Sequence, residues 1–135
     1  MSEVRAIVLH RSRRSLLAAL LAAAICEAGA ADAGRGEQLY EARCGGCHSI
    51  DTDRVGPRHA GLLGRKAGSI EGFDYSPALR AAGFTWDGER LGRWLADPEA
   101  LVPGQRMNVS VGHIADRADL IAYLARAGRS SAGKR

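Results

Sequence analysis

The stretch Cys44-Gly45-Gly46-Cys47-His48 decides how the rest of this sequence is interpreted. At the end of a helix, two cysteines three residues apart lie on one side and can each add to a vinyl group of a porphyrin. The next residue then points its imidazole at the iron, and the two glycines present little bulk to the porphyrin edge. The C-x-x-C-H spacing is therefore typical of covalent haem attachment.

Two other uses of this cysteine pair are weaker. A thioredoxin-type dithiol expects strands and helices in alternation, but no stretch of the sequence alternates apolar and polar residues. Half of a zinc site expects further Cys or His at short spacing. Beyond the motif and the first 30 residues there is no other cysteine, and the only other histidines are His59 and His113.

The first 30 residues have the three-part layout of a secretory signal peptide. Arginines precede an apolar run, Leu16–Ile25, and small residues follow, with an A-x-A cleavage site at Ala28-Gly29-Ala30 or one step later at Ala31-Asp32-Ala33. The run has about half of the ~20 residues that a membrane-spanning helix needs, although an uncleaved anchor is the alternative. Ile25 before Cys26 disfavours a lipoprotein. We therefore expect a signal peptide over 1–30 and a periplasmic domain over 31–135.

Export matters for the cysteines, because an oxidising compartment joins free thiols into a disulfide unless something else consumes them. Haem attachment would consume both Cys44 and Cys47. The charge of +4 comes partly from the leader: removing its four basic and two acidic residues from the 19 and 15 of the chain leaves +2. No basic block interleaved with aromatics remains, so we expect no nucleic-acid partner. Aromatic residues make up only 5%, and such a modest core commonly needs a cofactor as a staple.

Helical spacing and caps predict an all-α fold with three main helices and a short one. Between Cys47 and Ser76 the chain is rich in glycine and has no regular pattern. So long a loop is reasonable when it packs against a large apolar group that is not protein. The predicted helices are Ala33–Cys44, a short helix from Ser76-Pro77 to a stop at Gly83, Asp87–Ala96, and Asp116–Ala127 with an Asp cap and a stop at Gly128.

The candidates for a second axial ligand of the iron are Met107, His59 and His113. Met107 is the only methionine after the leader, and it follows a turn sequence about sixty residues after His48. That separation lets the chain wrap around the haem and return on its opposite face. Iron with one protein ligand suits gas binding or peroxide chemistry, whereas iron with two suits electron transfer. A Met/His pair raises the reduction potential.

Over residues 34–128 the sequence resembles class I cytochrome c of the mitochondrial type. The matching stretches are Gly36 with Tyr40, Val55-Gly56-Pro57, Gly64-Arg65-Lys66-Ala67-Gly68, Gly72-Phe73-Asp74-Tyr75-Ser76, Trp86, Leu91, Pro98, Pro103-Gly104 with Met107, and Arg117–Leu124.

The resemblance implies roles for these residues. The Pro57 carbonyl would accept the second imidazole N–H of His48, as partners of metal-bound histidines do. Tyr75 and Trp86 would donate to a haem propionate, with Arg65 offsetting its charge. Gly36 and Tyr40 would pack against the C-terminal helix near Leu120 and Tyr123.

The sequence also departs from the family. Trp94 stands where a tyrosine usually donates a hydrogen bond near the methionine sulfur, and the sequence leaves open whether an indole reaches that sulfur. Gln105 and Arg106 replace a usual threonine and lysine. Val109 replaces an aromatic at the haem edge, and His59 replaces a packed leucine, where it is solvated or bonded locally rather than a ligand.

The sequence thus predicts a small cytochrome c fold around one haem c, covalent through Cys44 and Cys47, with His48 and Met107 on the iron. We expect a monomeric electron-transfer protein, not an enzyme, that meets a redox donor and acceptor transiently and is not inserted in a membrane once the leader is removed. The alternatives are a haem subunit of a membrane redox complex and a haem enzyme or sensor with an open sixth site. A basic rim for partners, or else ordinary surface charge, is formed by Arg58, Arg65, Lys66, Arg93 and Arg106.

Overall fold

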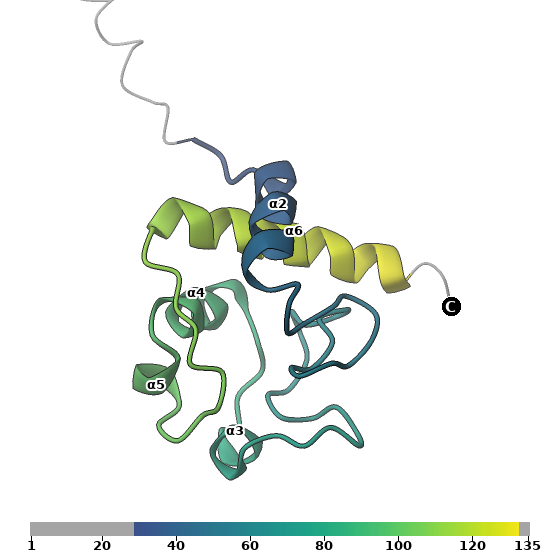
Figure 1. Ribbon diagram of the computed structural model, residues 1–135, viewed down its shortest axis with the longest axis vertical. Helices are drawn as coiled ribbons and strands as arrows, with labels where there is room; N and C mark the ends of the chain where they lie inside the picture. The colour runs from purple at the N-terminus through teal and green to yellow at the C-terminus, as the bar shows by residue number, and fades with distance from the viewer. Residues whose placement is uncertain (1–28, 133–135) are drawn as a thin grey trace, which may run out of the picture. The chain divides into compact units, whose positions relative to one another are not determined.

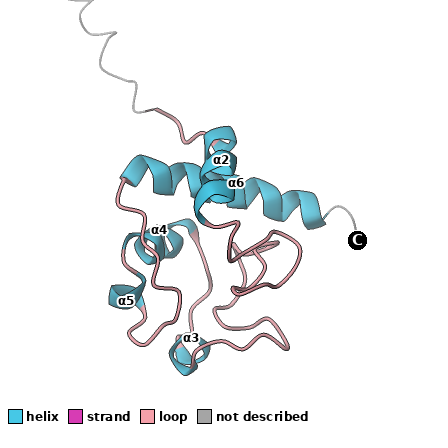
Figure 2. Cartoon of the chain, viewed as in Figure 1, coloured by secondary structure: helices cyan, strands magenta, loops and turns pink. Residues whose placement is uncertain are grey.

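The computed structural model describes residues 29–132, and within that range the regular secondary structure is helical. Most of the predicted signal peptide lies outside these residues, so that assignment stays a prediction. Figure 1 shows the helices in chain order, and Figure 2 shows how much of the chain between them is loop. The elements are α2 (Ala33–Arg43), α3 (Pro77–Ala81), α4 (Gly88–Ala96), α5 (Pro98–Leu101) and α6 (Ile114–Ala132).

Local capping explains where the helices begin. The side chain of Asp32 accepts hydrogen bonds from Gly34 N and Arg35 N at the start of α2. Ser76 caps α3 through Leu79 N, and Asp87 caps α4 through Arg90 N. Each cap accepts from a main-chain N–H that has no partner inside its helix. The all-α prediction is confirmed: the described residues contain no strand, only one isolated bridge between Lys66 and Thr85.

Two predictions about the helices are wrong. The short helix α5 is additional, capped by Asp97 through Ala100 N. The last helix begins at Ile114 rather than at an Asp116 cap, because the Asp116 carboxylate pairs with Arg35 instead. It also continues past Gly128. A Cβ at Gly128 would lie 3.2 Å from Gly61 N. This glycine therefore does not end the helix, and its missing side chain lets the loop at Gly61 approach.

The helices α2 and α4 both pack on α6, and α2 lies across it (Figure 1). The crossing with α2 is close: a Cβ on Gly36 would come within 2.0 Å of the Asp119 carbonyl oxygen. Tyr40 packs against Tyr123 with ring centroids 5.2 Å apart, as expected. The core then extends from the helices into the loops, where the buried apolar side chains are Leu62, Ala67, Trp86, Val102 and Val111.

Candidate functional site

The cysteine pair lies directly after α2. Cys44 caps that helix with its N–H bonded to the Tyr40 carbonyl, and the chain then turns so that His48 N donates to Cys44 O at 2.8 Å. Both cysteines are free thiols. Within residues 29–132, no group of three or more His, Cys, Asp or Glu side chains is placed to hold a metal ion.

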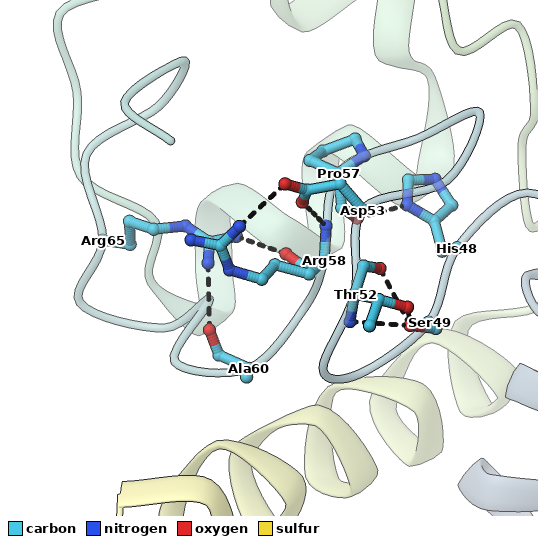
Figure 3. Close-up of polar contacts among 8 residues, drawn as sticks. All are labelled: His48, Ser49, Thr52, Asp53, Pro57, Arg58, Ala60 and Arg65. Carbon is cyan, nitrogen blue, oxygen red and sulfur yellow. Dashed lines mark hydrogen bonds and ion pairs between the residues drawn. The ribbon is translucent and has the colours of Figure 1, made fainter. Parts of the chain in front are cut away.

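His48 is fixed in one tautomer. Its Nδ1 lies 2.8 Å from the Pro57 carbonyl oxygen (Figure 3), and because a carbonyl only accepts, Nδ1 carries the proton. The lone pair is therefore on Nε2, the atom that a metal would take. Burial lowers the pKa of His48, although the hydrogen bond to Pro57 acts in the opposite direction. The lowered pKa favours the neutral imidazole, which is the form that binds iron.

The ring of His48 is enclosed on two further sides. A Cβ on Gly56 would lie 2.1 Å from its Cε1, so only glycine fits there. The ring of His59 stacks on it with centroids 4.2 Å apart. The Nδ1 of His59 shares a 3.0 Å hydrogen bond with the Tyr40 hydroxyl, and burial is the main cause that lowers the pKa of His59 to about 3. Of the two alternatives for His59, local hydrogen bonding is the one found.

Met107 lies in the loop between α5 and α6, and its sulfur has a partner. The Nε1–H of Trp94 donates to Met107 Sδ over 3.2 Å. The sequence left open whether an indole reaches this sulfur, and the structure shows that it does, because α4 brings the long indole ring close to the loop. His113, the other candidate ligand, is exposed and directly precedes α6.

Three side chains assigned to the haem propionates are buried or half-buried. Tyr75 and Trp86 are 7% and 6% exposed. The guanidinium of Arg65 donates to the carbonyls of Ala60 and Arg58 at 2.9 and 2.8 Å (Figure 3). Burial raises the pKa of Tyr75, and the charge of Arg65 opposes that rise.

The predicted basic rim is largely committed to internal contacts. Arg58 pairs with Asp53 at 2.7 Å (Figure 3), and Arg106 pairs with Asp74 at 3.2 Å. Together with the two carbonyl contacts of Arg65, these pairs favour the alternative of ordinary surface charge. No sequence motif indicates the part that Gln105 plays beside Met107, because its hydrogen bonds join residues that only the folded loop brings together.

The donor set of this site fits a c-type haem. Two free thiols and an imidazole with its lone pair on Nε2 lie in one turn, and a thioether lies in a separate loop. Covalent attachment of the haem to two cysteines needs free thiols. Axial ligation of the iron needs an unprotonated imidazole nitrogen and a neutral methionine sulfur. Each requirement is met by a described residue.

Comparison with known proteins agrees with this geometry. A family model described as Cytochrome c matches residues 33–127. A cytochrome c2 of Blastochloris viridis is 42% identical over 109 residues, covering 78% of this chain and 85% of that protein. A cytochrome c2 of Rhodomicrobium vannielii is 42% identical over 100 residues, covering 71% and 79%.

The solved structure of cytochrome cH from Methylobacterium extorquens superposes with a TM-score of 0.67 at 39% identity, and it covers 70% of this chain and 98% of that one. The expected cytochrome c fold is thereby confirmed. Cys44 and Cys47 stand where the family attaches haem c covalently. The chain belongs to the cytochrome c family.

Proposed function

We propose that this protein is a soluble monohaem electron carrier, in which His48 and Met107 are the two axial ligands of the iron. The observation that carries the proposal is that both ligand atoms are held by neighbours. The His48 tautomer is fixed by Pro57, and the Met107 sulfur accepts from Trp94. When bound, the haem supplies a one-electron couple, and a Met/His ligand pair shifts that couple toward the ferrous state.

The residues of this chain have separate tasks in such a carrier. Cys44 and Cys47 fix the haem in place, so that it is never lost between partners. Pro57 and Gly56 keep the His48 ring in one plane, which orients its lone pair. Held ligands move little between oxidation states, and a small rearrangement favours rapid electron transfer.

We assign Tyr75 and Trp86 as hydrogen-bond donors to a propionate, with Arg65 lowering the cost of its negative charge. Burial of both aromatic residues supports this role, since packing restricts the positions from which the hydroxyl and the indole N–H can donate. The positive charge of Arg65 lowers the pKa of Tyr75, against the effect of burial, so the two side chains interact electrostatically.

We further propose that residues 1–30 are a signal peptide, that the domain over 31–135 works in the periplasm as a monomer, and that it turns over no substrate. Its partners are a protein donor and a protein acceptor met transiently, through the small interfaces usual for redox pairs. The similarity to bacterial cytochromes c2 supports this assignment. Among the described residues, none of the helices has the length and apolar character needed to cross a membrane.

The test is the absorption spectrum of the natively exported protein. Ferric iron bound by a thioether gives a weak band at long wavelength, and ferrous iron with both positions filled binds carbon monoxide slowly. We expect wild-type protein to show the band and to resist carbon monoxide, and Met107→Ala to lose the band, bind carbon monoxide at once and have a lower reduction potential. The matched control is Val109→Ala, an exposed apolar residue of the same loop, which should keep the band. A wild type without the band, open to carbon monoxide, contradicts the carrier function and favours an enzyme or sensor.

A further inference from the structure

The loop that carries Met107 is organised around the side chain of Gln105. This residue is only 8% exposed, although its neighbours Gly104 and Arg106 are exposed. A polar side chain buried in a surface loop loses its contact with water, so its burial is favourable only when hydrogen bonds replace that contact.

The carboxamide of Gln105 makes four such bonds. Its Oε1 accepts from the main-chain N–H of Met107 and from that of Asn108, the latter at 3.2 Å. Its Nε2 donates to Glu99 Oε2 at 3.3 Å and to Asn108 Oδ1 at 3.1 Å. A primary amide has two donor hydrogens and two acceptor lone pairs, so the full capacity of Gln105 is used inside this loop.

These bonds hold the chain on both sides of the sulfur ligand. Glu99 belongs to α5, and its other oxygen accepts from Gly104 N at 2.9 Å, which ties the start of the loop to that helix. Asn108 follows Met107 with φ of 50°, a left-handed conformation that Asn adopts when its side chain hydrogen-bonds locally. Gln105 bonds both the main chain and the side chain of Asn108, so it stabilises the bend directly after Met107.

We propose that Gln105 is a positioning residue that keeps the Met107 thioether on the haem iron. It thereby sets how rarely the Met107 sulfur dissociates from the iron in the ferric protein. Trp94 contacts the sulfur atom itself, whereas Gln105 holds the backbone from which that side chain extends. The inference rests on the proposed function, because it requires Met107 to be an axial ligand.

The experiment measures how fast cyanide binds to the ferric holoprotein, since cyanide binds only after Met107 has left. Gln105→Leu keeps the approximate volume and removes all four hydrogen bonds, and we expect cyanide to bind at least about tenfold faster. Glu99→Ala removes only the bonds to Gln105 and Gly104 and should give a smaller increase in the same direction. The matched control is Gln38→Leu, at an exposed glutamine of α2, which should bind cyanide at the wild-type rate.

A second measurement separates positioning from general stabilisation. In a denaturant titration, the thioether band of Gln105→Leu should disappear at a lower concentration than the one that unfolds the protein, as followed by tryptophan fluorescence. The positioning role is wrong if the band and the folded protein are lost at the same denaturant concentration, or if Gln105→Leu and Glu99→Ala bind cyanide at the wild-type rate. The carrier function stands in either case. If the wild type itself has no thioether band, both proposals are overturned.

Discussion

The indole Nε1–H of Trp94, in helix α4, donates a hydrogen bond of 3.2 Å to Sδ of Met107, in the loop between α5 and α6. A thioether sulfur has two lone pairs, so under the proposed ligation one binds the iron and the other accepts from the indole. The indole N–H is a donor only. It therefore always withdraws electron density from the sulfur, which weakens donation to ferric iron more than to ferrous iron.

Replacing Trp94 by Phe should lower the reduction potential. The substitution keeps an aromatic ring in the core and removes the donor to sulfur. If the bond is worth about 1 kcal/mol more in the ferrous state, the potential falls by about 40 mV for one electron. Trp94→Tyr should also shift it, because a hydroxyl reaches the sulfur from a different distance. A redox titration that finds all three proteins at one potential would mean that Trp94 only packs.

Replacing Gly56 by Ala should disturb the His48 ring. The new Cβ would lie 2.1 Å from Cε1 and 2.5 Å from Nδ1 of that ring, so the imidazole must shift and its hydrogen bond to Pro57 must weaken. Overpacking of this kind costs about 1–3 kcal/mol. We expect a lower midpoint in denaturant and an altered ferric electron paramagnetic resonance spectrum. Gly112→Ala is the control, since its Cβ would meet no atom within 4 Å.

The local parts of the fold were predictable from the sequence because their causes are local. Ser76 before Pro77 and Asp87 before α4 are caps that act within three residues. Asp97 before Pro98 carries the same capping signal, and α5 begins there. Gly128 does not end α6, contrary to the prediction, because its use is to let the backbone at Gly61 approach, and Gly61 is far away in sequence.

The candidate site divides in the same way. The motif around His48 is local and was predicted from spacing, whereas Pro57 was assigned only through resemblance, and its bond to His48 depends on how the loop folds back. The contact between Trp94 and Met107 could not be predicted, because the reach of an indole depends on where α4 packs. No pattern in the sequence marks the four bonds of Gln105.

Two glycines in helices should respond to alanine with opposite signs. At Gly36 the Cβ would lie 2.0 Å from the Asp119 carbonyl oxygen, so Gly36→Ala must separate α2 from α6 and lower the free energy of unfolding. At Gly92, inside α4, the Cβ would meet only Ile121 Cδ1 at 3.7 Å, an ordinary contact. Gly92→Ala should therefore raise that free energy by up to about 1 kcal/mol through helix propensity. Denaturant unfolding of both holoproteins measures the difference, and a loss at Gly92 as large as that at Gly36 would contradict the packing argument.

The acid stability of the protein should depend on Asp119. Its carboxylate accepts from Asp32 N at 2.7 Å and pairs with Arg35, and these two contacts, in that order, lower its pKa below the ordinary value of 3.8. A carboxyl group whose pKa is lower in the folded state contributes stability that is fully present above the unfolded pKa. That contribution is lost as the pH falls below 3.8 and through the lowered pKa of the folded protein.

Asp119→Asn should consequently unfold more easily at neutral pH and lose less stability on acidification than the wild type. The melting temperature measured from neutral pH down to the start of acid unfolding checks both parts. Asp74→Asn is the control, because that side chain is 85% exposed and its pairs with Arg80 and Arg106 are solvated. An Asp119→Asn variant whose melting temperature follows the wild-type pH curve would show that the junction of α2 with α6 is held by packing at Gly36 and not by this carboxylate.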